Sequence, residues 1–239
     1  MARVGTSGWV YPHWRGVFYE GPQSTWLAQY TAEFDTVELN GSFYRWPSEQ
    51  RFAAWRDRLP EGFEMTVKAA RGLTHARRLR EPEEWIARTT AGLHALRGRR
   101  GPLILQLPPT MERDDARLDY FLGALPDWTR PVLEFRHSSW NDESVFSLLE
   151  RHGAAYCVMS GARLPCILRA TAPLVYVRLH GPDPDHLYGG SYSDEDMAWW
   201  AERIREWERS GHEVYAYFNN DGGGNAVFNA RTLKRILQS

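Results

Sequence analysis

Cysteine is scarce in this sequence, which has only Cys157 and Cys166 among its 239 residues. Their spacing matches no metal-ligand or redox motif, and two thiols give no disulfide framework for a domain of this length. No apolar run approaches the roughly 20 residues of a membrane span, and the first residues show no basic region followed by an apolar stretch. We therefore expect a cytoplasmic protein with no membrane contact.

An excess of charge of either sign is also lacking. The 29 Lys and Arg residues almost balance the 30 Asp and Glu residues, which leaves a net charge of -1. This balance excludes a global field that would draw the chain to nucleic acid or a membrane, so any attraction for phosphate must be local. Internal repeats, low-complexity tracts and linkers are missing too, and the length suits one barrel of roughly 250 residues. We expect a single domain over residues 1–239.

Short β-type runs alternate with helical patterns along the chain. The strand-like runs cover residues 3–7, 36–39, 64–68, 103–107, 131–135, 155–159, 174–180 and 213–218. Alternation of this kind implies a parallel sheet, either closed as a barrel or open and doubly wound. The Gly-rich phosphate fingerprint of the open folds does not occur. The pattern therefore predicts a TIM (β/α)8-like barrel with its site at the C-terminal mouth of the strands.

The helical segments have readable ends. They cover residues 25–34, 49–59, 82–97, 142–152, 193–210 and 225–237. Ser193 can cap the start of its helix and Gly211 closes it. Between the sixth and seventh strands, Pro165 and Pro173 leave little room for a helix.

Period-two alternation assigns one row of each strand to the barrel interior. In residues 36–40, Val37 and Leu39 should face the helices, which turns Glu38 and Asn40 inward. The same rule turns further polar residues inward, and three more end the last strand: Lys68, Gln106, Glu134, Arg136, Arg178, His180, Asn219, Asn220 and Asp221. All lie toward the C-terminal ends of their strands, where TIM-barrel active sites are found.

Carboxylates, cations and histidine at one mouth indicate acid/base chemistry. We predict catalytic roles for Glu38, Lys68, Glu134 and His180, with the amides, the arginines, Asp221 and His137 binding substrate. The arginine pair Arg136 and Arg178 could clamp a phosphate or carboxylate. The alternative is a set of buried ion pairs that only hold the strands together. Compact metal-ligand spacings are missing, so no cofactor and no metal ligand are predicted, although a divalent metal is left open.

Aromatic residues gather on the loops after the first and second strands. They are Trp9, Tyr11, Trp14, Phe18 and Tyr19, followed by Phe43, Tyr44 and Trp46. Such rings can stack on a sugar or base, or can form a small core that closes the top of the barrel. His75, in the loop after the third strand, could also reach the mouth. Trp9, Tyr11, Tyr44 and His75 join the predicted substrate-binding set.

The chain resembles the domain-of-unknown-function-72 family, also called YecE-like, nearly from end to end. The resemblance is carried by these motifs: Gly5-Thr6-Ser7-Gly8-Trp9 with Tyr11, Trp14 and Gly16; Val37-Glu38-Leu39-Asn40 with Phe43-Tyr44-Arg45; Val67-Lys68 with Arg71, Thr74 and His75; Leu105-Gln106-Leu107-Pro108-Pro109; Glu134-Phe135-Arg136-His137 with Ser139-Trp140; Tyr176-Val177-Arg178-Leu179-His180-Gly181 with Tyr188; and Phe218-Asn219-Asn220-Asp221 with Ala226 and Asn229-Ala230. It implies a TIM-like barrel and adds Trp140 and Tyr188 to the substrate-binding set. It implies no particular activity.

Three functional hypotheses follow. The first is an enzyme of hydrolase or isomerase type that uses acid/base chemistry on a small polar anion, such as a sugar or nucleotide phosphate. The second is a nucleic-acid-binding or DNA-repair-like barrel, which rests on fold analogy, the aromatic loops and local arginines. The third is a module that binds a ligand without turning it over.

Overall fold

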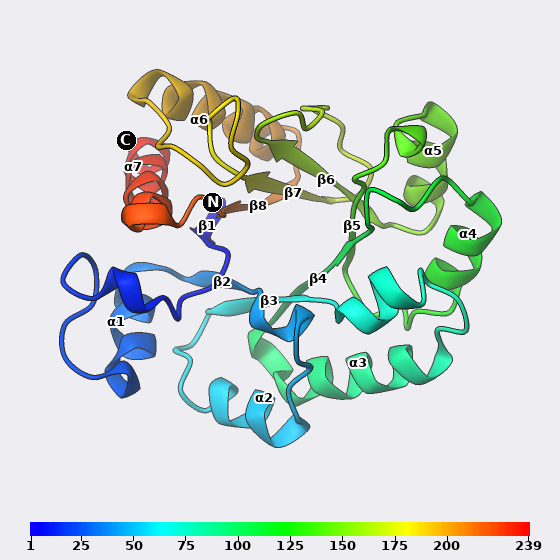
Figure 1. Cartoon of the computed structure of the whole chain (residues 1–239), viewed down its shortest axis with the longest axis horizontal. Helices are drawn as coiled ribbons and strands as arrows, with labels where there is room; N and C mark the ends of the chain where they lie inside the picture. The colour runs from blue at the N-terminus through cyan, green and yellow to red at the C-terminus, as the bar shows by residue number, and fades with distance from the viewer. The chain divides into compact units, whose positions relative to one another are not determined.

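The computed structural model describes residues 1–239, and its eight strands are parallel and alternate with helices along the chain (Figure 1). The strands are β1 (Arg3–Thr6), β2 (Thr36–Leu39), β3 (Glu64–Lys68), β4 (Arg100–Gln106), β5 (Pro131–Glu134), β6 (Ala155–Ser160), β7 (Leu174–Leu179) and β8 (Glu213–Phe218). Their order in the sheet is β1-β8-β7-β6-β5-β4-β3-β2. Strands that follow the order of the sequence, with β1 beside β8, define the predicted TIM-like α/β barrel.

Seven α-helices connect the strands. They are α1 (Trp26–Glu33), α2 (Glu49–Arg56), α3 (Glu83–Ala95), α4 (Asp115–Gly123), α5 (Glu143–Arg151), α6 (Asp194–Arg209) and α7 (Asn225–Gln238). The capping of α6 agrees with the sequence prediction. The Ser193 hydroxyl accepts a hydrogen bond from the Asp196 backbone N–H at 3.1 Å, and the Asp196 carboxylate accepts one from the Ser193 backbone N–H. No helix forms between β6 and β7, as the two prolines predicted.

Two differences from the sequence predictions are explained by acidic caps. Helix α5 starts one residue later than expected, because the Asp142 carboxylate caps it by accepting the Ser144 N–H at 3.0 Å. Helix α4 was not predicted. Its start is set by Asp114, whose carboxylate accepts the Arg117 N–H at 3.0 Å. An acidic cap before a short amphipathic run was therefore the signal that the sequence reading missed.

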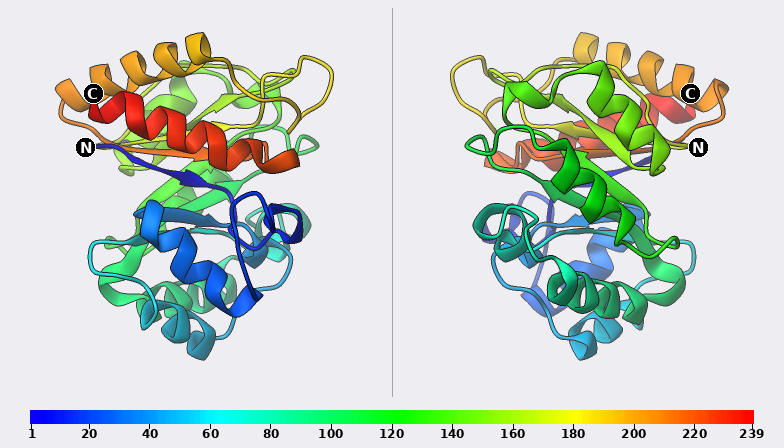
Figure 2. Two further views of the ribbon diagram at one scale, coloured as in Figure 1. Left: turned by 90° about the vertical axis from the view of Figure 1, so that its left-hand side faces the viewer. Right: turned by 90° about the vertical axis from the view of Figure 1, so that its right-hand side faces the viewer.

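The chain divides into two compact units. Unit 1 holds residues 1–38, 158–169 and 173–239, and unit 2 holds residues 39–157 and 170–172. In unit 1, α6 and α7 lie side by side and α7 packs against β1 and β8 (Figures 1 and 2). In unit 2, α2 packs on α3, and β3, β4 and β5 are neighbours. The single domain expected over residues 1–239 stays a prediction.

The interior of unit 1 is unusually rich in tyrosine. Tyr176 on β7 stacks against Tyr215 and Tyr217 on β8, with ring centroids 6.4 and 5.2 Å away. All three rings are fully buried, and the Tyr217 hydroxyl bonds the Thr36 hydroxyl at 2.5 Å. Buried phenols need hydrogen-bond partners, so these strands place polar atoms inside the unit as well as apolar rings.

Candidate functional site

A closed carboxylate network lies at the strand ends of unit 1. We call Ser7, Glu38, Tyr176 and Arg178 the Glu38 network. Glu38 accepts hydrogen bonds from the Ser7 hydroxyl at 2.5 Å, from the Arg178 guanidinium at 2.7 Å and from the Tyr176 hydroxyl at 2.6 Å. The side chains of Glu38 and Arg178 are both 0% exposed. A ligand could therefore reach Glu38 only after one of these bonds opened.

Sequence alternation explains this network. Tyr176 and Arg178 are two residues apart on β7, so both side chains lie on one face of the strand. Burial and the Glu38 carboxylate raise the pKa of Tyr176 well above its usual value. The phenol thus stays a hydrogen-bond donor to Glu38. Tyr176 and Ser7 were not among the predicted site residues, although the position of Tyr176 relative to Arg178 could have revealed it.

The loop after β1 covers the end of β8. The His13 imidazole and the Trp14 indole N–H both contact the Asp221 carbonyl, at 2.9 and 3.3 Å. Tyr11 donates to the Ser7 carbonyl at 2.5 Å, and burial followed by the Asp221 and Glu38 carboxylates raises its pKa. Tyr11 thus lies close enough to Asp221 and Glu38 for both carboxylates to act on it electrostatically.

His180 and its neighbours form a second polar group in unit 1. His180 is fully buried, and its Nδ1 lies 3.2 Å from the Asn219 side-chain nitrogen. Tyr188 packs its ring edge-on at 5.4 Å from the imidazole. Asn220 donates to the Gly190 carbonyl at 3.0 Å and to Asn229 at 2.9 Å. These hydrogen bonds link the loop before α6 to the end of β8.

Unit 2 has a more open arrangement, which we call the cationic cluster: Lys68, Arg71, His75, Glu134 and Arg136. Glu134, the last residue of β5, is 0% exposed and pairs with the Arg136 guanidinium, whose side chain is 9% exposed. Gln106, the last residue of β4, is the register partner of Glu134 and donates to its carboxylate at 2.7 Å.

Phe43 joins the remaining members of the cationic cluster. The Lys68 ammonium lies 4.4 Å from the centre of the Phe43 ring, and the His75 ring packs edge-on against the same ring at 4.9 Å. Burial, then Lys68 and Arg71, then Arg136 lower the pKa of His75, while Glu134 opposes them. Three cations thus lower the pKa of this imidazole, and a single carboxylate raises it. The resulting positive local charge favours the binding of an anion.

Three other predicted residues have well-defined surroundings in unit 2. His137 Nδ1 accepts the Ser139 N–H at 3.2 Å, so the proton of the neutral ring lies on Nε2. Trp140 is fully buried, stacks on Phe135 and donates its indole N–H to the Met111 carbonyl at 2.9 Å. Asn40, at the end of β2, has a buried side-chain oxygen without a hydrogen-bond partner. That oxygen could accept a donor from a ligand or from water.

Most aromatic residues of the two loops are packed rather than displayed. Trp9, Trp14, Tyr19, Phe43 and Trp46 are buried, and Tyr19 stacks on Trp26 of α1 at 4.8 Å. Tyr44 is the exception, since 78% of its surface is exposed and its ring stands edge-on against Phe43 at 5.1 Å. Most of these rings are thus buried, as expected for packing within the loops, whereas the Tyr44 ring is exposed to solvent.

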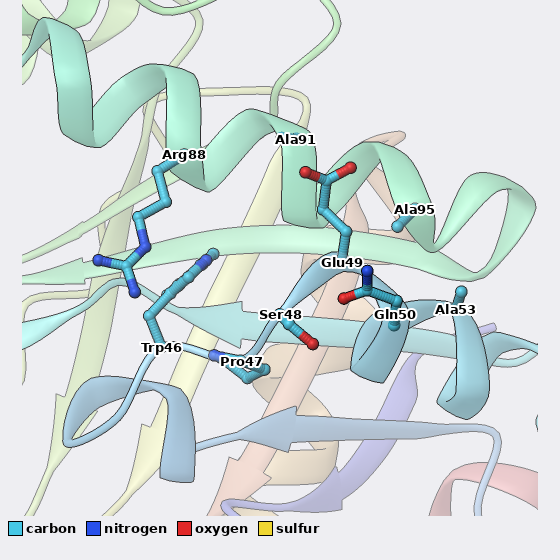
Figure 3. A pocket seen from close by; sticks show the side chains of 9 residues that line it. All are labelled: Trp46, Pro47, Ser48, Glu49, Gln50, Ala53, Arg88, Ala91 and Ala95. Carbon is cyan, nitrogen blue, oxygen red and sulfur yellow. The ribbon is translucent and has the colours of Figure 1, made fainter.

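A groove on the outside of unit 2 holds none of the predicted site residues (Figure 3). It has a volume of about 650 Å³ and is lined by Trp46, Pro47, Ser48, Glu49, Gln50 and Ala53 and by Arg88, Ala91 and Ala95 of α3. Elsewhere, no three or more His, Cys, Asp or Glu side chains gather with the geometry of metal ligands. None of the helices has the length and apolar character required to cross a membrane.

The strand order defines the class of the protein, a TIM-like α/β barrel. The model of the family described as "Protein of unknown function DUF72" matches residues 3–239, so the chain belongs to this family, as its motifs indicated.

Relatives agree with this assignment. The UPF0759 protein YunF of Bacillus subtilis is 25% identical over 99% of this chain and 95% of its own length. The UPF0759 protein YecE of Escherichia coli is 28% identical over 57% of this chain and 49% of its own length. The crystal structure of a DUF72 family protein from Thermotoga maritima superposes with a TM-score of 0.91 at 29% identity and covers 100% of both chains. One from Enterococcus faecalis, at 21% identity and a TM-score of 0.86, covers 100% of this chain and 96% of its own and supports the fold alone.

Proposed function

We propose that this protein is an enzyme that uses acid/base chemistry on a small polar anion, such as a sugar or nucleotide phosphate, bound at the cationic cluster. The observation that carries the proposal is the packing of Lys68 and His75 on the same Phe43 ring, close enough to Arg71, Glu134 and Arg136 for their charges to act on the imidazole. Three cations opposed by one carboxylate attract an anion, and arginine binds phosphate or carboxylate oxygens in a bidentate way.

The proposal gives the two carboxylate–arginine pairs different roles. The side chains of Arg178 and Glu38 are both fully buried in their pair, whereas 9% of the Arg136 side chain is exposed beside its buried partner Glu134. We therefore assign anion binding to Arg136, Lys68 and Arg71. Glu134 and His75 are the ionisable groups of this site, and Asn40 and Gln106 supply amides for the uncharged part of a substrate.

The proposed chemistry uses no cofactor. Binding of a divalent metal is tested separately in the experiment below. The scarcity of cysteine supports the cytoplasm as the proposed compartment.

The experiment is a thermal-shift screen of the full chain against sugar phosphates, nucleotides, oligonucleotides and divalent metals. A ligand at 100 times its dissociation constant stabilises the native state by about 2.7 kcal/mol, which is easily detected. We expect a small phosphate ester to raise the Tm of the wild type and of Arg231→Ala, a control at the Glu33 ion pair, but not of Arg136→Ala. Products in the incubation mixture then test turnover.

Two results would favour the other hypotheses. Stabilisation by oligonucleotides alone, lost as salt is added, would identify a nucleic-acid-binding protein. A small anion that binds at the cationic cluster but is recovered unchanged after long incubation would identify a ligand-binding module.

A further inference from the structure

The segment that carries His75 has an unusual backbone. Residues Gly72–Ala76 form a π-helical turn, closed by a hydrogen bond of 2.9 Å from the Arg77 N–H to the Gly72 carbonyl. Directly after it, Arg78 and Leu79 have φ angles of 50° and 62°, a region that non-glycine side chains rarely adopt. Leu79 is buried there. Single π-turns and strained residues of this kind concentrate at functional sites.

Gly72 makes this turn compatible with the neighbouring helix. A Cβ atom at this position would lie 2.3 Å from the Trp85 indole on α3, closer than any real contact. Any larger residue at position 72 would therefore require the Trp85 ring to move. Packing of Gly72 against Trp85 of α3 thus helps to position the turn that carries His75.

The hydrogen bonds of Thr74 determine which nitrogen of His75 carries the proton. The Thr74 hydroxyl lies 3.3 Å from the Ala70 carbonyl, and it must be the donor there because a carbonyl cannot donate. Its oxygen is then free to accept, and His75 Nδ1 lies 3.0 Å away. This arrangement places the proton of the neutral imidazole on Nδ1 and the lone pair on Nε2. Nε2 has no hydrogen-bond partner.

The charged groups that face the imidazole come from two strands and their loops. Lys68 ends β3 and Arg71 follows it, while Glu134 ends β5 and Arg136 follows it. Phe43 adds an uncharged ring edge. Partial burial and then the cations lower the pKa of His75, so the neutral form with its Nε2 lone pair dominates at neutral pH.

We propose that His75, as the Nδ1–H tautomer, is the proton acceptor of the cationic cluster and acts on an anion held by Lys68, Arg71 and Arg136. The inference rests on the proposed function and adds the identity of its base. Nε2 takes a proton from an oxygen or carbon of the bound anion, and the electron pair of the broken bond stays on that atom. The three cations stabilise the negative charge that develops there, and the imidazolium returns the proton in a later step.

The tautomer is tested by ¹⁵N NMR of the imidazole rings of the full chain, with the His75 signals assigned by their loss in His75→Gln. We expect the neutral Nδ1–H form at pH 7. Thr74→Ser should keep this tautomer because it keeps the hydroxyl, and Thr74→Val should lose it. An Nε2–H ring in the wild type, or a Thr74→Val spectrum identical to that of the wild type, would overturn the inference.

Proton coupling is tested with sulfate, a dianion whose charge is constant over the range in which histidine titrates. If the anion binds beside Nε2, it raises the pKa of His75, and sulfate binding takes up protons. A rise of about one pKa unit would make sulfate bind about tenfold more tightly below the pKa of His75 than above it. Calorimetry in buffers of different ionisation enthalpy measures the uptake.

His75→Gln separates this inference from the proposed function. The variant should still bind sulfate above the pKa of His75, because the three cations remain, but it should take up no proton and show a flat pH profile. Sulfate binding that depends on Arg136 yet takes up no proton in the wild type would leave the anion site standing and refute His75 as its base. No sulfate binding at any pH would refute both.

Discussion

The Glu38 network and the cationic cluster use the same pair of residue types in opposite ways. In the first, a carboxylate and an arginine are both fully buried, and a serine and a tyrosine complete the hydrogen bonding of the carboxylate. In the second, Glu134 is buried but Arg136 is partly exposed, and Lys68, Arg71 and a half-buried His75 lie around the pair. Both occur at the C-terminal ends of parallel strands.

The difference shows that position at the barrel mouth does not by itself make a residue available for chemistry. A fully buried carboxylate–arginine pair contributes order, and opening it costs several kcal/mol. A pair with excess positive charge and an imidazole beside it can bind an anion at lower cost. The cationic cluster is therefore the better candidate for binding and proton transfer, and the Glu38 network for support.

The largest expected effect of a single substitution is on stability. Glu38→Gln leaves the Arg178 charge buried without its carboxylate, which should lower the free energy of unfolding by about 3–5 kcal/mol. Urea denaturation followed by tryptophan fluorescence measures it. The matched control Glu134→Gln should lose less, because 9% of the Arg136 side chain is exposed whereas the Arg178 side chain is fully buried. Equal losses in the two variants would remove the distinction between the sites.

The next effect concerns anion binding. Arg136→Ala removes a charged donor worth about 1.5–3 kcal/mol and should weaken sulfate binding about tenfold or more. Calorimetric titration gives the affinity. Arg178→Lys keeps its charge inside the Glu38 network, so its Tm should fall while sulfate affinity is unchanged. Weaker sulfate binding in Arg178→Lys than in Arg136→Ala would mean that the roles have been assigned to the wrong arginine.

Alkaline pH should act on the Glu38 network. The pKa of Tyr176 is raised in the native state, so above pH 10 the unfolded chain loses this proton while the native protein keeps it. The stabilisation is complete below pH 10 and decreases above it, by about 1.4 kcal/mol per pH unit for one tyrosine. Tyr176→Phe should show a shallower loss in urea denaturation at several pH values. An unchanged slope would argue against a buried neutral phenol.

The smallest expected change is at Tyr44. Because the ring is largely exposed, Tyr44→Ala should leave the Tm and the sulfate affinity of the wild type unchanged. Adenosine monophosphate should bind several-fold more weakly to the variant if its base stacks on this ring. Equal affinities for wild type and variant would favour a substrate without an aromatic ring.

The fold could be predicted almost completely from the sequence. All eight strands lie within a few residues of their predicted positions, because buried β-type runs separated by capped helices leave few other arrangements. The exceptions have local causes. Strand β4 begins at Arg100, three residues before the predicted 103, and α4 depends on a single acidic cap at Asp114.

The site could be predicted only as a set of residues. Alternation correctly identified Glu38 and Arg178 as inward-facing, but their pairing joins residues 140 positions apart, which no local pattern encodes. The π-turn at Gly72–Ala76 was not predicted, because it depends on the fit of Gly72 against Trp85 on another helix. The surroundings of His75, which carry the functional argument, therefore required the structure.

The most direct test of the account is a crystal structure of the protein grown or soaked with tungstate, a heavy dianion that anomalous scattering locates without bias. The account predicts tungstate within hydrogen-bond distance of Arg136 and Lys68, with His75 Nε2 facing it and the Glu38 network intact. Tungstate bound to Arg178 through an opened Glu38 network, or absent from the cationic cluster at saturating concentration, would contradict it.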